Sequence, residues 1–222
     1  MDYRFHNEVT IPFSDVDLEG ELAIPLKANA VVIFSHGSGS SRMSPRNRMV
    51  ANRLHEKNFG TLLFDLLSTA EDRYYENRFD IELLTKRLVG ATEWLEAHHA
   101  AKSCRIGFFG ASTGAASALK AASYLSQIKA VVSRGGRPDL AIDNLRYVDA
   151  PTLLIVGSLD YDVLRLNKEA FIQLAGEKKM EIIEGATHLF EETGMMDKVI
   201  DLAVGWFEKY LLTAMRLENK IA

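Results

Sequence analysis

The stretch from Gly110 to Gly114 has the pattern Gly-x-Ser-x-Gly, with Ser112 at its centre. A short apolar run (104–109) precedes the pattern, and small helix-forming residues (115–122) follow it. A strand, a tight turn and a helix in this order are typical of a nucleophile elbow, which exposes a serine hydroxyl. The glycines remove side chains that would collide at the turn, and the helix N-terminus favours developing negative charge. The chemistry predicted for Ser112 is attack on a carbonyl carbon, that is, acyl transfer.

A serine nucleophile needs a base that takes its proton and an acid that orients the base. In a chain with this elbow the partners are expected in the order serine, acid, histidine, each after a strand. Of the six histidines, His188 alone has this order and position, and Asp160 follows the strand expected before it. Asp162 is the alternative acid. We favour Asp160, because Asp162 lies immediately before the expected helix, where an acidic residue usually caps the N-terminus.

A glycine-rich loop, His36-Gly37-Ser38-Gly39-Ser40, leaves another apolar strand. It lacks the Gly-Lys-Ser/Thr sequence of a phosphate-binding P-loop. We expect the backbone N–H groups of Ser38 and Thr113 to form an oxyanion hole. For His36 the favoured role is to brace the loop through hydrogen bonds, and the alternative is direct proton transfer.

Four arginines lie in loops that are expected to open on the same face of the protein. They are Arg42, Arg46, Arg134 and Arg137. Because a guanidinium group suits a carboxylate or a phosphate, these residues are candidates for binding an anionic substrate. The alternative is that they form surface salt bridges with Asp139, Asp143 or Glu71.

Apolar runs alternate with amphipathic stretches along the whole chain, which predicts a mostly parallel sheet with helices on both faces. The expected strands are 8–13, 21–24, 30–34, 61–67, 104–109, 128–133, 151–156 and 180–183, the first two forming an antiparallel hairpin. The expected helices are 42–58, 79–99, 115–122, 163–175 and 194–217, with a polar surface loop at 68–77 and a short amphipathic turn at 140–147. His98 and His99 are expected in the last turn of the second helix, where they favour the helix dipole rather than bind a metal. All these elements are expected to form one α/β domain, residues 1–222.

The composition of the 222-residue chain is that of an ordinary globular protein, with 47% hydrophobic residues and a formal net charge of −4. This charge does not favour binding to nucleic acid or to an anionic membrane. No apolar stretch approaches the ~20 residues of a membrane span, and the N-terminus has no apolar leader, so we expect a cytoplasmic protein. The single cysteine, Cys104, excludes an intrachain disulfide, and no metal-binding spacing is present. We therefore expect neither a metal nor a cofactor.

With these motifs in view, the chain resembles the α/β-hydrolase family, and within it the dienelactone-hydrolase-like branch. The resemblance covers essentially the full length and rests on the His36 loop, the Ser112 elbow, the 157–160 segment and Gly185-Ala186-Thr187-His188. The stretch 39–47 is also similar to relatives that are sometimes fused to a phosphoribosyltransferase domain. True dienelactone hydrolases carry a cysteine nucleophile, whereas this chain has Ser112, which favours an ordinary serine esterase. Many relatives insert a cap domain where this chain has only residues 134–150, so the resemblance implies an open site for small or exposed acyl groups.

These observations favour a serine hydrolase that cleaves small esters or lactones, including anionic ones, through an acyl-enzyme. A thioesterase or a peptidase would use the same catalytic groups, and the sequence does not separate these leaving groups. A non-catalytic protein that binds a small ligand on the same fold is the alternative of a different class. The intact set of Ser112, Asp160 and His188 speaks against it, because a binding pocket does not need all three.

Overall fold

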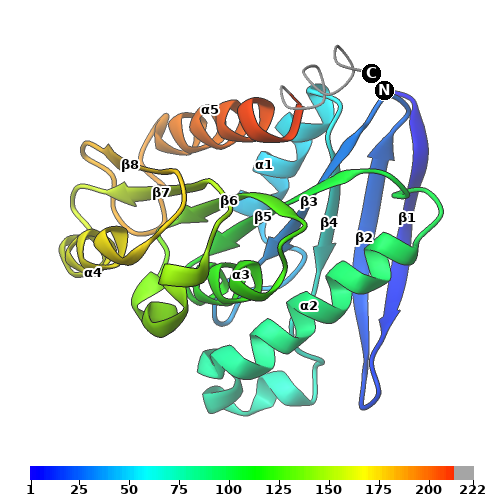
Figure 1. The fold of residues 1–222 in the computed structure, drawn as a ribbon, viewed down its shortest axis with the longest axis horizontal. Helices are drawn as coiled ribbons and strands as arrows, with labels where there is room; N and C mark the ends of the chain where they lie inside the picture. Colours follow the sequence, from blue (N-terminus) through cyan, green and yellow to red (C-terminus); the bar gives the residue numbers. More distant parts are fainter. Residues whose placement is uncertain (213–222) are drawn as a thin grey trace.

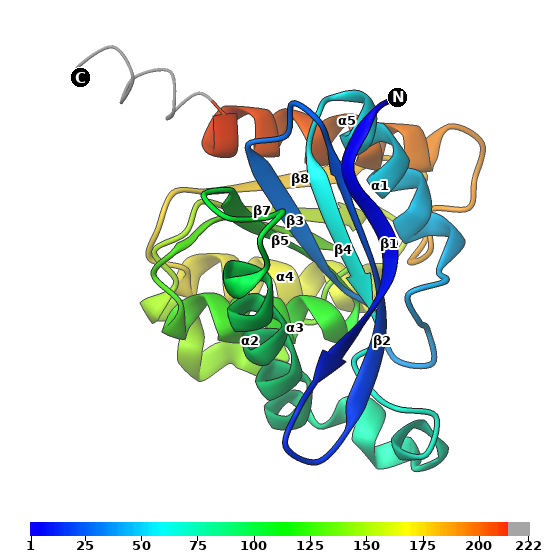
Figure 2. The same cartoon turned by 90° about the vertical axis from the view of Figure 1, so that its right-hand side faces the viewer.

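The computed structural model describes residues 1–212, in which eight strands form a single twisted sheet with the order β1-β2-β4-β3-β5-β6-β7-β8 (Figures 1 and 2). The strands are β1 (Tyr3–Pro12), β2 (Asp17–Pro25), β3 (Ala30–Ser35), β4 (Gly60–Phe64), β5 (Arg105–Ala111), β6 (Ile128–Arg134), β7 (Thr152–Gly157) and β8 (Lys178–Ile183). β1 pairs with β2, and β2 with β4, in the antiparallel sense. All other neighbouring strands are parallel. The predicted hairpin and mostly parallel sheet are thus confirmed.

Helices cover both faces of the sheet, as predicted. They are α1 (Pro45–Glu56), α2 (Ile81–Ala97), α3 (Thr113–Tyr124), α4 (Tyr161–Gln173) and α5 (Met195–Phe207), with the short 3₁₀ helices η1 (Glu71–Arg73), η2 (Tyr75–Phe79) and η3 (Pro138–Tyr147) and a π-helical turn η4 (Glu208–Leu212). α1 and α5 lie on one face, and α2, α3 and α4 lie on the other (Figures 1 and 2). Each face encloses its own layer of buried apolar side chains.

The central strands form because their apolar runs can be buried on both sides. All six residues of β3, Ala-Val-Val-Ile-Phe-Ser, are buried. Odd and even positions alternate between the two core layers, so that Val31 packs toward α2 and α3, and Val32 packs toward α1 and α5. Full burial of one valine or leucine side chain contributes about 1.5–3 kcal/mol, which makes these strands a firm support for the loops at their ends.

Several element boundaries differ from the sequence prediction. α1 begins at Pro45 and not at Arg42, because the Ser44 hydroxyl accepts a hydrogen bond from the Asn47 N–H (3.3 Å) and caps the helix there. β4 ends at Phe64, and the predicted surface loop 68–77 contains η1 and the start of η2. α3 is longer than predicted at both ends, and the end of the last predicted helix, 213–217, lies outside the described residues.

The predicted place of His98 and His99 in the last helical turn is wrong. α2 ends at Ala97, and His98 is an extended residue that follows it, so neither histidine lies in the last turn. Their rings instead stack on each other with centroids 4.7 Å apart, and both contact Phe5.

Between β6 and β7 the chain forms η3 alone, and no cap domain covers the sheet within the described residues. Among residues 1–212, no helix has both the length and the apolar character needed to cross a membrane.

Candidate active site

Four loops carry Ser38 and the three predicted catalytic residues, and all four leave the carboxyl ends of parallel strands. Ser38 follows β3, Ser112 follows β5, Asp160 follows β7 and His188 follows β8. Because these strands are parallel neighbours in one sheet, their ends meet at one edge, the usual place for a site in an open α/β sheet. The topology therefore brings together residues that lie up to 150 positions apart in the sequence.

The backbone at Ser112 has the strained geometry expected of an elbow. Its φ of 51° and ψ of −122° are unusual for a residue with a side chain, and it stands directly before α3. A Cβ atom on Gly110 would lie 2.4 Å from the Ala115 Cα, and one on Gly114 would lie 2.1 Å from the Ser35 carbonyl oxygen. Any side chain at either position would push the turn apart, which explains both glycines physically.

His188 and Asp160 are joined by a short hydrogen bond, 2.6 Å between Nδ1 and Oδ2. Nδ1 donates this bond to the carboxylate, so that Nε2 is free to accept a proton from another group. Asp160 occupies the position before α4 without using its side chain as a cap. α4 begins at Tyr161, two residues earlier than predicted, so Asp162 lies in the first turn and the expectation that it caps the helix is wrong.

Ser112 and His188 line a common cavity of about 240 Å³. The remaining lining residues are Gly37, Ser38, Ser40, Ser44, Arg46, Asn47, Ala111, Arg134 and Leu189. Most of these residues are polar, and the cavity is large enough for a small acyl group beside the serine. No motif in the sequence indicates that Ser44 and Asn47 belong to this site, because only the start of α1 brings them here.

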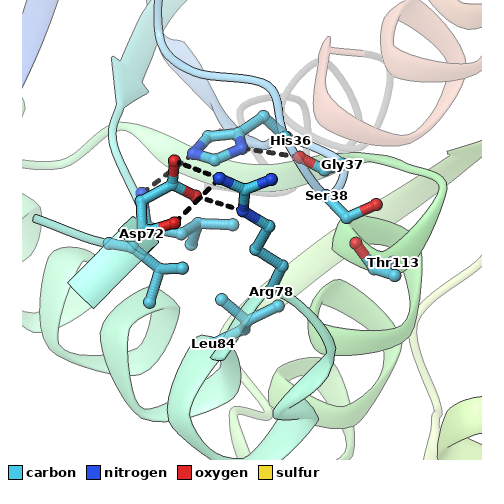
Figure 3. A pocket seen from close by; sticks show the side chains of 10 residues that line it. His36, Gly37, Ser38, Asp72, Arg78, Leu84 and Thr113 are labelled. Atoms are coloured by element: carbon cyan, nitrogen blue, oxygen red, sulfur yellow. Dashed lines mark hydrogen bonds and ion pairs between the residues drawn. The ribbon is translucent and has the colours of Figure 1, made fainter. Parts of the chain in front are cut away.

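The loop after β3 lies against the elbow. A Cβ atom on Gly37 would stand 3.0 Å from the Ser112 Cβ, so glycine permits this close approach. Ser38 and Thr113 line the same small hollow, shown in Figure 3, whose volume of about 10 Å³ suits one water molecule. Arg78 closes the far side of this hollow, held by a two-pronged ion pair with Asp72 (2.9 Å). No local feature of the sequence indicated that Asp72 and Arg78 would lie beside this loop.

His36 holds the loop through both ring nitrogens. Nε2 accepts a hydrogen bond from the Leu66 N–H, and Nδ1 donates to the Gly37 carbonyl oxygen, each at 3.0 Å (Figure 3 shows the latter). Burial lowers the pKa of His36, so the neutral ring with a proton on Nδ1 is the stable form. With both nitrogens engaged, the geometry fits the predicted bracing role and not proton transfer.

The four arginines have different partners. Arg42 pairs with Asp65, which its backbone N–H contacts at 2.7 Å, and Arg137 forms a fork with Asp139 at 2.8 and 2.9 Å. Neither Arg42 nor Arg137 lines the cavity. Arg46 pairs at 2.7 Å with Glu191, and Arg134 is buried at the end of β6. Thus only Arg46 and Arg134 of the four line the cavity that contains Ser112.

Comparison with known proteins identifies the family. Residues 89–197 match the family model described as "BAAT / Acyl-CoA thioester hydrolase C terminal". The sequence is 48% identical to that of dienelactone hydrolase from Anabaena variabilis, whose crystal structure superposes with a TM-score of 0.90. The match covers 93% of this chain and 98% of the Anabaena chain. The esterase Est1E from Butyrivibrio proteoclasticus shares the fold at 15% identity, covering 91% of this chain and 98% of its own with a TM-score of 0.78.

Curated relatives from two strains of Mycobacterium tuberculosis carry the name putative phosphoribosyl transferase. Each is 50% identical over 205 residues, which is 92% of this chain but 46% of the relative. The chain thus spans about half the length of these relatives. The fold, the near-complete match to the Anabaena structure and the hydrolase model together show that the chain belongs to the dienelactone-hydrolase-like branch of the α/β-hydrolase family.

Proposed function

We propose that this member of the hydrolase family cleaves carboxylic esters or lactones through an acyl-enzyme formed on Ser112. The observation that carries the proposal is the 2.6 Å hydrogen bond from His188 to Asp160, with the imidazole on the same cavity as the Ser112 side chain. His188 is thereby oriented with Nε2 as an acceptor, and Asp160 stabilises the imidazolium that forms during the reaction. A pocket that only bound a ligand would not require this arrangement.

In the proposed reaction, Ser112 Oγ attacks the carbonyl carbon while His188 Nε2 takes its proton. The negative charge that develops on the carbonyl oxygen is stabilised by the N–H groups of Ser38 and Thr113 and by the N-terminus of α3. His188 then gives the proton to the leaving alkoxide, which departs as an alcohol. A water molecule attacks the acyl-enzyme in the same way, its proton passing through His188 to Ser112, and the carboxylic acid is released.

The absence of a cap over the described residues leaves the cavity reachable from solvent, which suits small or exposed acyl groups. Thioester hydrolysis is the second candidate, because the matching family model describes an acyl-CoA thioester hydrolase. The same groups would serve it, with a thiolate as the leaving group. A peptidase uses the same groups as well, but no feature of the cavity favours an amide substrate.

The test is covalent labelling with a fluorophosphonate, combined with the pre-steady-state burst from 4-nitrophenyl acetate. We expect one label per chain, on Ser112, and a burst equal to one product per active chain. Ser112→Ala and His188→Ala should each lower kcat by about 10⁶-fold, because the two residues act as a unit. A folded Ser112→Ala variant with near-normal esterase activity would show that the proposal is wrong. Matched acetyl oxyester and thioester substrates then distinguish the two candidate leaving groups.

A further inference from the structure

The cavity beside Ser112 contains a buried positive charge that the described residues do not neutralise. The Arg134 residue is 7% exposed, and its side chain makes no hydrogen bond or ion pair within residues 1–212. Its Nε is wholly buried without an acceptor, and so is the Nε of Arg46, which lines the same cavity. Two guanidinium groups thus have donors near Ser112 that are removed from water and unused.

A buried Nε without an acceptor is also present at Arg48 and Arg87, so what distinguishes Arg134 is that its side chain has no carboxylate partner among the described residues. The other buried arginine, Arg87, is paired with Asp15 at 2.7 and 3.0 Å and with Glu71 at 2.7 Å. Burial of an unpaired charge is strongly unfavourable, and buried charges in proteins are normally paired. Burial and the nearby Arg46 lower the pKa of Arg134 to about 10, so it is still charged at neutral pH.

The start of α1 adds a second feature that favours an anion. Ser44, Arg46 and Asn47 form the cap and first turn of this twelve-residue helix, and all three line the cavity. The first turn contains no acidic residue, so the positive end of the helix dipole acts together with the two arginines. The carboxylate that contacts Arg46 belongs to Glu191, whose side chain is 63% exposed and can therefore turn into solvent when a ligand takes its place.

We propose that Arg134, Arg46 and the first turn of α1 form a binding subsite for a phosphate group carried by the substrate. This inference rests on the proposed function, because the subsite shares its cavity with the catalytic serine. A phosphate monoester has a charge of about −1.5 to −2 at pH 7 and three terminal oxygens, so it can contact both guanidinium forks and the helix N-terminus at once. A carboxylate, with two oxygens and one charge, would engage a single fork. The preferred substrates are therefore small esters or lactones that bear a phosphate.

Inorganic phosphate is the probe, because its binding can be measured without turnover. Titration calorimetry at low ionic strength should show saturable binding of one phosphate per chain, weakened at least 10-fold by Arg134→Met or by Arg46→Met. Arg53→Met is the matched control, since Arg53 lies on the exposed side of α1 and contacts Glu56, away from the cavity. This control should bind phosphate as the unchanged protein does. Phosphate should also raise the KM for 4-nitrophenyl acetate without changing kcat.

Absence of phosphate binding to the unchanged protein, or equal binding by Arg134→Met, would overturn the proposal. Acetate that binds more tightly than phosphate with the same dependence on Arg134 would also overturn it, in favour of a carboxylate subsite. If Arg134→Met does not fold, Arg46→Met decides in its place. Phosphate binding without fluorophosphonate labelling of Ser112 would contradict the proposed function and leave the subsite standing, so the two failures are distinguishable.

Discussion

Gly135 lies directly against the imidazole of His188. A Cβ atom on Gly135 would stand 3.1 Å from the His188 carbonyl oxygen and 3.5 Å from Cε1 and Nδ1 of its ring. The backbone of Gly135 has a φ of +52°, which favours glycine, and its N–H donates to the Ile155 carbonyl oxygen at 2.8 Å. The loop after β6 therefore forms one wall of the space in which His188 is held. The arginines around this glycine could be recognised in the sequence, whereas its contact with His188 could not.

We expect Gly135→Ala to lower kcat by roughly 10–10²-fold, because the added methyl group displaces His188 from its position relative to Ser112. The matched control is Gly194→Ala. Gly194 has a φ of +76°, but a Cβ atom there would meet nothing within 4 Å. Both variants should lose about 1–2 kcal/mol of stability from backbone strain, and only Gly135→Ala should lose activity. The measurements are kcat for 4-nitrophenyl acetate and denaturant unfolding; equal kcat values for the two variants would contradict the assigned contact.

The strands and the nucleophile turn could be predicted from the sequence because their determinants are local. Continuous apolar runs gave β3 and β7 within one residue at each end, and the glycines around Ser112 are explained by contacts of the turn itself. The order of Ser112, Asp160 and His188 along the chain was enough to predict that they approach one another, because parallel strands present their ends at one edge.

Other features of the site depend on how the chain folds around it, and the sequence pattern did not predict them. The acceptor role of His36 requires Leu66, thirty positions away, and the ion pair of Asp72 with Arg78 depends on how η1 and η2 fold. The four arginines are equivalent as letters in the sequence. The pairing of Arg137 with Asp139, two positions away, was among the alternatives predicted from the sequence, whereas only the fold decides that Arg134 is buried without a carboxylate.

The two acidic residues after β7 should differ sharply in kinetic effect. Asp160→Asn should reduce kcat by up to roughly 10⁴-fold, because the amide N–H can donate to Nδ1 and so favours the tautomer of His188 that carries its proton on Nε2. Asp162→Asn should leave kcat unchanged and cause only a small loss of stability, since Asp162 is an exposed residue in the first turn of α4. Steady-state kinetics on both variants, with unfolding curves as the control for folding, provide the test. The opposite ranking would identify Asp162 as the catalytic acid.

Stability should fall as the pH is lowered from about 6.5 toward about 4, in part because of His55. Burial lowers the pKa of His55 to about 4, and the ring accepts or donates one hydrogen bond with Thr61 at 2.8 Å. In the unfolded chain the pKa is about 6.5, so below that pH the unfolded state binds a proton that the folded state does not. His55 should therefore contribute a loss of about 1–2 kcal/mol between pH 7 and pH 5. Urea unfolding at each pH should show a shallower dependence for His55→Gln; an identical dependence would exclude this role.

His36→Ala distinguishes a residue that positions the loop from one that transfers protons. The variant loses the acceptor for the Leu66 N–H and the donor to the Gly37 carbonyl oxygen, so the adjacent Ser38 N–H is no longer held in place. Because loss of one oxyanion donor costs about 10²–10³-fold, kcat should fall by no more than that, far less than the ~10⁶-fold expected for His188→Ala. The pH dependence of kcat/KM should keep its shape, since His188, which takes the proton in the proposed reaction, is unchanged. A folded His36→Ala variant as inactive as His188→Ala, or one whose pH profile has lost an ionisation, would instead place His36 in the proton-transfer path.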